Sequence, residues 1–145
     1  MRSHPFSTAV TINTDSSAVW NVLTKPEIMP LWMGEPDMNI EVHTNWQVNT
    51  PIIIRGFHHL KFENKGIVLK FDQPSSLSYT HLSSLSQLSD LPVNYSIIEF
   101  TLTPVDGQTA LTLYITNFPT ESIRKHLEFY WRTTILKIKE SAELK

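Results

Sequence analysis

Tyr79 and His81 are the residues whose types and spacing most readily support chemistry. They lie in the segment "LSYTHL" (77–82), which has the composition of a β-strand, so Leu77, Tyr79 and His81 share one face. A phenol and an imidazole at the end of an apolar face could hold a ligand, because binding pockets are mostly apolar with a few polar groups. The imidazole could also act as a general base. The alternative is a hydrogen-bonded histidine near the edge of a sheet.

The other histidines form no recognisable metal motif. His58 and His59 are neighbours in an expected strand, so their side chains should point to opposite faces. The chain has no cysteine, no Gly-x-Ser-x-Gly elbow, no glycine-rich phosphate loop and no His-Glu-x-x-His motif. The sequence therefore predicts no metal, no cofactor and no catalytic motif, and it favours a protein that is not an enzyme. Catalysis by Tyr79 and His81 is the less favoured alternative.

Composition narrows the class of protein. The chain has 145 residues, of which 41% are hydrophobic and 18% charged, with a net charge of −2. These values are typical of a globular domain, and the absence of a basic run argues against a nucleic-acid partner. No signal-peptide pattern opens the sequence, and no apolar run approaches the roughly 20 residues that cross a bilayer. We therefore expect one domain, residues 1–145, in the cytoplasm and without a membrane span.

Seven segments have the length and residue types of strands, and they must position Tyr79 and His81. These strands are expected at 6–13, 38–44, 46–56, 58–71, 77–82, 94–104 and 109–116. The second and third should pair as a hairpin around Asn45, with Pro51 at an edge or a bulge. The fourth should be interrupted near Asn64–Gly66. An Asp-Gly turn should join the last two strands, and the serine-rich segment 83–90 is typical of a loop.

Three helices complete the expected order. Thr14 and Asp15 could cap a first helix that ends before Pro26, and a second short helix should span Glu27 to Met33. A third, long amphipathic helix is indicated by apolar residues at helical spacing from Glu121 onward, at Ile123, Leu127, Trp131, Ile135, Ile138 and Ala142. This order predicts an α+β fold, in which a curved antiparallel sheet of about six or seven strands wraps around the C-terminal helix. A ligand could sit between that helix and the sheet.

Several segments together resemble one known family. The stretch "VWNVLTKPEIMPLWMG" (19–34) resembles the signature of the heat-shock-protein-90 ATPase activator homologue family, through Val19, Trp20, Leu23, Thr24, Pro26, Glu27, Trp32 and Gly34. Later segments are similar to further parts of that family, in the family's order: "GIVLKFDQPSSLSYTH", "FTLTPVDGQTALTLYITNFP" and "HLEFYWRTTILKIKE". Each piece alone is weak, but the ordered set covers nearly the whole chain and is fairly specific for the fold.

The resemblance implies a fold and two alternative functions. The family belongs to the START-like SRPBCC superfamily, so a helix-grip fold around a hydrophobic cavity is expected. The leading function is binding of a small hydrophobic or amphipathic molecule, and the alternative is a chaperone-ATPase-activator-like interaction module. His81 stands where the family often has tryptophan, Met33 where a second tryptophan is frequent, and Tyr130 where glycine is common. The cavity lining should therefore be this chain's own, and no relative's ligand is carried over.

The candidate cavity residues are aromatic, aliphatic and a few polar side chains. They are Trp32, Trp46, Phe62, Tyr79, His81, Ser96, Ile98, Phe100, Leu113, Leu127 and Trp131. The tryptophans are expected in the core more than in contact with a ligand, because large aromatics dominate burial in either case. If His81 lines the pocket, an acidic ligand should bind more tightly as the pH falls through about 6.5, and burial of the ring would lower that midpoint.

Overall fold

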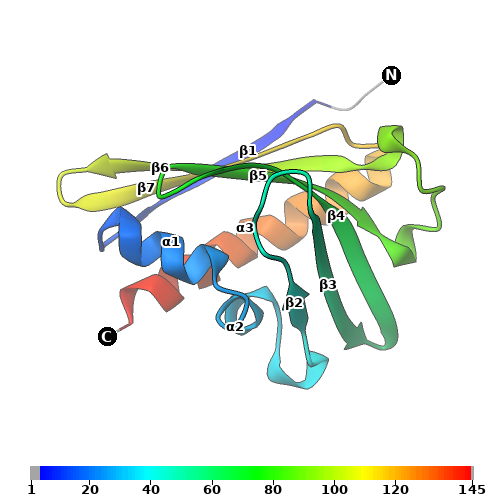
Figure 1. The fold of residues 1–145 in the computed structure, drawn as a ribbon, viewed down its shortest axis with the longest axis horizontal. Coiled ribbons are helices and arrows are strands. Elements are labelled where there is room, and N and C mark those ends of the chain that lie inside the picture. The colour runs from blue at the N-terminus through cyan, green and yellow to red at the C-terminus, as the bar shows by residue number, and fades with distance from the viewer. Residues whose placement is uncertain (1–3, 145) are drawn as a thin grey trace.

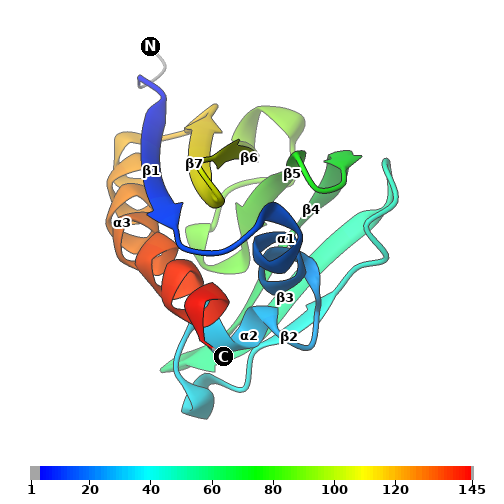
Figure 2. The same cartoon turned by 90° about the vertical axis from the view of Figure 1, so that its left-hand side faces the viewer.

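One curved antiparallel sheet forms the framework of the computed structural model, which describes residues 4–144. In spatial order its strands are β1 (Phe6–Ile12), β7 (Gln108–Thr116), β6 (Ser96–Val105), β5 (Ser76–Ser83), β4 (Leu60–Asp72), β3 (Pro51–His58) and β2 (Glu41–His43). The concave side holds α1 (Ser16–Thr24), α2 (Met29–Met33) and the long α3 (Glu121–Glu143) (Figure 1, Figure 2). Short 3₁₀ turns occupy Pro36–Met38, Ser84–Ser86 and Pro92–Asn94. The predicted α+β architecture is confirmed.

The two short helices form where polar caps and prolines define their ends. The Asp15 carboxylate accepts a hydrogen bond from the Ala18 N–H at 2.8 Å, which satisfies one of the unpaired donors at the start of α1. The second helix begins at Met29 and not at the predicted Glu27. Residues 26–28 form a turn instead, and Pro30 lies in the first turn of α2, where its missing N–H has no consequence.

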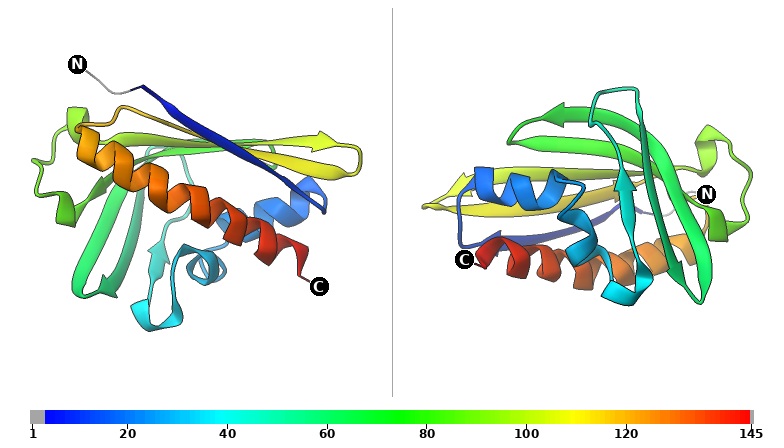
Figure 3. Two further views of the ribbon diagram at one scale, coloured as in Figure 1. Left: turned by 180° about the vertical axis from the view of Figure 1, so that it is seen from behind. Right: turned by 60° about the horizontal axis from the view of Figure 1, so that its bottom comes forward.

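The long helix α3 follows the predicted apolar stripe. Thr120 caps it by accepting a hydrogen bond from the Ile123 N–H at 3.1 Å. At about 1.5 Å per residue the helix is about 34 Å long, and it runs across the sheet from one end to the other (Figure 3). Its buried side chains are Leu127, Trp131, Thr134, Ile135, Ile138 and Ala142. The alternating residues of β6 and β7 meet this stripe from the sheet, as their predicted alternation requires.

The hairpin of β2 and β3 forms in the predicted order, but its strands are shorter. Glu41 pairs with Arg55, whereas residues 44–50 form a loop. The backbone of Trp46 has φ 59°, and an Asn45 Oδ1 contact with the Thr50 hydroxyl at 2.8 Å closes the loop. A positive φ cannot continue a strand, so the predicted strand start at Trp46 is wrong. Pro51 is the first residue of β3, a position that tolerates its missing N–H.

The predicted interruption near Asn64–Gly66 is wrong, because β4 is continuous there and its register with β5 shifts later, between Val68 and Lys70. β4 runs on without a break, but its pairing with β5 passes from Lys65–Leu82 to Val68–Tyr79. Between these pairs the Ile67 N–H donates to the Thr80 hydroxyl at 2.9 Å instead of to a main-chain carbonyl. A Cβ on Gly66 would lie 1.7 Å from the Thr80 carbonyl oxygen. Glycine is therefore required for the two strands to approach this closely.

We predict that Gly66→Ala destabilises the fold by at least about 1–3 kcal/mol, the usual range for forced overpacking, because the Thr80 main chain cannot move aside freely. Urea unfolding would measure the change. Ile67→Val is the matched control, since this neighbouring side chain is 46% exposed and should shift stability by less than about 0.5 kcal/mol. Equal stability of the two variants would contradict the close strand approach.

Candidate functional site

The middle of the space between sheet and α3 is filled by aromatic rings. Trp131 of α3 has its ring centroid 5.6 Å from that of Phe100 on β6 and 6.2 Å from that of Trp32 on α2. All three are buried, and the Trp32 indole N–H donates to the Val22 carbonyl at 2.8 Å. These candidate cavity residues are therefore packed against one another and act first as core.

A second aromatic group closes the space between α1 and β5. The ring of Trp46 lies 6.1 Å from that of Tyr79 and stacks on Phe71 at 5.3 Å. Its indole N–H donates to the Thr24 carbonyl at the end of α1, at 2.6 Å. Trp46 therefore ties the β2–β3 loop to the core. The expectation that tryptophans are core residues is met by the buried side chains of Trp32, Trp46 and Trp131.

The remaining candidate cavity residues differ in how deeply their side chains are buried. Ser96, Ile98, Leu113 and Leu127 are buried with the aromatic rings. His81 and Phe62 are only partly buried. His81 sits opposite Ser96 in the pairing of β5 with β6, so these two are brought together. Phe62 lies apart from them, beside Gly56 in the pairing of β3 with β4.

The hydroxyl of Tyr79 is an unpaired polar group inside this apolar surface. The side chain is 3% exposed, yet its hydroxyl makes no hydrogen bond to any residue that the structure describes. Among residues 4–144, Ser76 Oγ is the one side-chain polar atom that is fully enclosed and has no hydrogen-bond partner. The Tyr79 hydroxyl is therefore unpaired but not fully enclosed. We use the word groove for the side of the sheet that faces α3, whose middle is filled by the rings described above, and we call the surroundings of Tyr79 and His81 the polar end of the groove.

Two residues of α3 that were not predicted as site residues, the half-buried Tyr130 and the exposed His126, lie near the polar end. Tyr130 lies close enough to Tyr79, and His126 to His81, to influence their protonation. The Tyr130 hydroxyl donates to the Met33 carbonyl at 2.7 Å and so ties α3 to α2. Helical spacing in the sequence could have indicated these two residues, because His126 and Tyr130 are four residues apart and so lie along one side of the apolar stripe of α3.

The polar end carries little charge at neutral pH. Burial lowers the pKa of His81 to about 4, and the neighbouring His126 lowers it further in the same direction. Burial raises the pKa of Tyr79 well above its usual range, with Tyr130 as a second cause. Burial also raises the pKa of Tyr130 to about 12. Tyr79, His81 and Tyr130 are therefore neutral hydrogen-bonding groups near pH 7.

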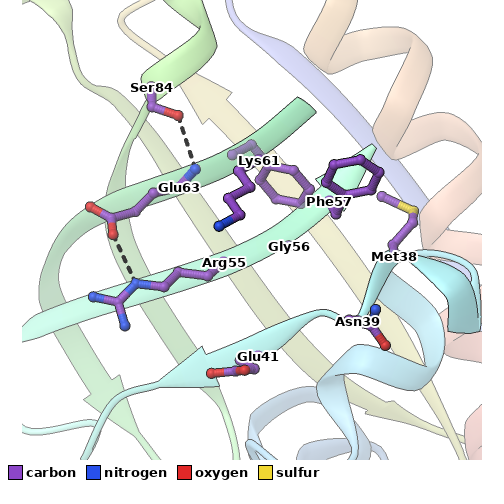
Figure 4. A pocket seen from close by; sticks show the side chains of 10 residues that line it. Met38, Asn39, Glu41, Arg55, Gly56, Phe57, Lys61, Glu63 and Ser84 are labelled. Carbon is purple, nitrogen blue, oxygen red and sulfur yellow. Dashed lines mark hydrogen bonds and ion pairs between the residues drawn. The ribbon is translucent and has the colours of Figure 1, made fainter. Parts of the chain in front are cut away.

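A depression of about 650 Å³ lies elsewhere, at the corner formed by β2, β3 and β4 (Figure 4). Two of its charged lining residues pair with each other, since Arg55 Nε is 2.8 Å from Glu63 Oε1, and a third, Glu41, pairs with His43 outside the lining. Phe62 is the only candidate cavity residue among its lining residues. A smaller hollow of about 190 Å³ beside it includes the Lys65–Asp90 ion pair, at 2.6 Å. Both depressions are open and carry charged residues on their walls.

The prediction for the adjacent histidines is wrong. His59 has φ 66° and turns the chain between β3 and β4, so the rings of His58 and His59 lie 4.6 Å apart and not on opposite faces. Within residues 4–144, no three histidine, aspartate or glutamate side chains are grouped so that they could hold a metal ion. Over the same residues, none of the helices is long and apolar enough to cross a membrane.

The curved sheet that grips a long C-terminal helix, with two short helices beside it, defines a helix-grip fold. The family described as activator of Hsp90 ATPase homolog 1-like protein matches residues 13–143, and the chain belongs to this family. A search of curated proteins found no match.

Solved structures agree with this assignment. The solution structure of ChR145 from Cytophaga hutchinsonii is 30% identical, with a TM-score of 0.80 over 99% of this chain and 96% of that one. Protein CV1439 from Chromobacterium violaceum is 14% identical, with a TM-score of 0.83 over 97% and 98% of the two chains. A structure described as the Aha1 dimer from Colwellia psychrerythraea is 16% identical, with a TM-score of 0.77 over 98% of each chain. The last two likenesses concern the fold alone.

We predict that Trp131→Ala destabilises the protein by about 3–5 kcal/mol, the range for deleting a large buried aromatic side chain. The cause is the loss of its packing against Phe100 and Trp32. Thr133→Ala, on the exposed side of the same helix, is the control and should change stability by less than about 0.5 kcal/mol. If the melting temperature of Trp131→Ala equals that of the control, α3 does not hold the sheet as described.

The lowered pKa of His81 predicts a loss of stability in mild acid. The unfolded chain has an ordinary histidine pKa near 6.5 and the folded chain one of about 4, so the unfolded chain binds more protons between these values. Stability from this group is present above about pH 6.5 and is lost as the pH falls toward 4. From pH 7 to 4.5, the parent should lose about 2–3 kcal/mol more than His81→Phe, as measured by urea unfolding. Parallel losses in both proteins would show that His81 titrates normally.

Proposed function

We propose that this chain binds a small, uncharged amphipathic molecule at the polar end of the groove. The main support for this proposal is the hydroxyl of the buried Tyr79 side chain, which has no hydrogen-bond partner among the described residues. A ligand that offers this hydroxyl a hydrogen bond would gain about 0.5–1.5 kcal/mol, the usual net contribution of one such bond. The apolar part of the ligand would contact the aromatic and aliphatic surface around Leu127 and Trp131.

The charge state of the polar end supports an uncharged polar group on the ligand. Because the Tyr79 phenol and the His81 imidazole are both neutral near pH 7, they offer hydrogen bonds without a charge to balance a carboxylate. An alcohol, amide or phenol group suits such a site. The affinity increase near pH 6.5 that the sequence suggested for an acidic ligand is therefore not expected, since His81 protonates only near pH 4.

Binding explains the site better than catalysis does. The groups that shift the pKa of His81 are burial and His126, with no carboxylate among them. A histidine general base is usually oriented and stabilised by a carboxylate or another acceptor at its second nitrogen. We therefore place an enzyme that uses Tyr79 and His81 behind a binding protein. A cytoplasmic location remains part of this proposal.

The family description names activation of the Hsp90 ATPase, so a chaperone ATPase is the alternative partner. Such a partner would contact the outside of the protein and would not need the Tyr79 hydroxyl. The two functions therefore respond differently to one substitution inside the groove.

We predict that Tyr79→Phe weakens the binding of an uncharged fluorescent probe, N-phenyl-1-naphthylamine, by about five- to tenfold. The substitution removes one hydrogen bond worth about 1–1.5 kcal/mol and keeps the ring that packs on Trp46. Tyr114→Phe is the matched control, because Tyr114 lies on the exposed face of β7 and should bind the probe like the parent. Fluorescence titration at pH 7 measures both.

Two results would overturn this proposal. One is equal probe affinity in the parent, Tyr79→Phe and Tyr114→Phe, which would place the probe elsewhere. The other is no binding by the parent, together with stimulation of a chaperone ATPase that Tyr79→Phe leaves intact. That second result would favour the interaction module.

A further inference from the structure

The outer face of α3 carries large apolar side chains that nothing in residues 4–144 covers. Phe129 is 78% exposed and Leu136 is 55% exposed, although they lie two turns apart on the same side of the helix. The left view of Figure 3 shows α3 along the surface of the molecule, with no other element in front of it. We define the outer face of α3 by Lys125, Phe129, Leu136 and Glu140.

Lys125 and Glu140 differ from the other charged residues of α3. Most charges on this helix have a partner within the chain: Arg124 and Arg132 pair with Glu128, Lys139 with Glu143, and Lys137 with Glu35. Lys125 and Glu140 have no ion pair among the described residues, and both lie beside the exposed apolar side chains. This face thus presents one free positive and one free negative charge at its two ends.

We propose that a second copy of this chain packs on the outer face of α3, with the two helices antiparallel. Phe129 and Leu136 have their midpoint between residues 132 and 133, close to the middle of α3, and Lys125 and Glu140 share that midpoint. A two-fold axis at that midpoint places Phe129 against the partner's Leu136. It also places Lys125 level with the partner's Glu140, and symmetry repeats both contacts.

The charges favour this arrangement over a parallel one. Parallel helices would bring Lys125 against the partner's Lys125 and Glu140 against the partner's Glu140, whereas the antiparallel pair joins opposite charges. The positive charge nearest the two-fold axis is Arg132, and it already has partners within its own chain. Arg132 Nη2 is 3.5 Å from Glu128 Oε1, and its guanidinium lies 4.9 Å from the ring centre of Phe6. The centre of the interface is thereby left to Thr133 and the apolar pairs.

The area of the outer face of α3 indicates how tightly the proposed dimer should associate. A standard interface buries about 800 Å² on each partner, and one helix face supplies less than that. We therefore expect a dimer with a dissociation constant in the micromolar range or weaker. Phe129, about one turn from the two-fold axis, is the large aromatic side chain of the contact, and a few such residues usually carry most of the binding energy.

Analytical ultracentrifugation of the full chain from about 1 to 500 μM tests the proposal. We expect reversible dimerisation, with a dissociation constant raised at least about tenfold by Phe129→Asp. Leu31→Asp is the matched control, because Leu31 on α2 is 73% exposed and lies outside the proposed face. Circular dichroism would confirm that both variants keep the parent's fold, as substitutions at exposed positions should.

A charge exchange tests the antiparallel register. Lys125→Glu and Glu140→Lys should each weaken the dimer, and the double variant should restore it, because each exchanged charge again meets its opposite across the two-fold axis. A parent that stays monomeric at 500 μM, or a dimer that Phe129→Asp leaves unchanged, would overturn the proposal. A double variant no tighter than the single ones would overturn the antiparallel arrangement.

Discussion

The packing of α3 into the concave sheet is the constraint on which the rest of the structure depends. Its central contact is Trp131, which lies between Phe100 of the sheet and Trp32 of α2. Trp131 is the largest of the six buried side chains of this 23-residue helix, and isolated helices draw little stability from propensity alone. The same contact fixes α2 against α3, where the Tyr130 hydroxyl reaches the Met33 carbonyl.

The position of the candidate site follows from where this packing stops. Along one face of β5, the buried Leu77 and Tyr79 belong to the core, and the next residue on that face, His81, is only partly buried. Tyr79 and His81 leave a phenol without a hydrogen bond and an imidazole whose pKa is about 4. Burial thus makes both groups neutral hydrogen-bonding partners. The proposed ligand class, apolar with an uncharged polar group, is the chemical complement of that surface.

The fold was largely predictable because periodicity and capping are local signals. The apolar stripe of α3, the alternation in β6 and β7 and the Asp15 cap are all readable without tertiary information. Two of the errors, at Trp46 and at His59, occur where the backbone has positive φ, because non-glycine residues with that geometry give no clear sequence signal. The site was predicted only in part. Strand alternation revealed the Tyr79 and His81 pair, but the extent to which rings fill the groove depends on three-dimensional packing.

The most direct test of the account is a solution NMR titration of the ¹⁵N-labelled protein with an uncharged amphipathic probe such as a medium-chain alcohol. The four tryptophans serve as reporters at known positions. The account predicts the largest indole shifts at Trp46 and Trp131, which adjoin Tyr79 and Tyr130, and the smallest at Trp20, which contacts Phe71 instead. Shifts confined to Phe57 and Arg55, at the corner of β2, β3 and β4, would contradict a ligand site at the polar end of the groove.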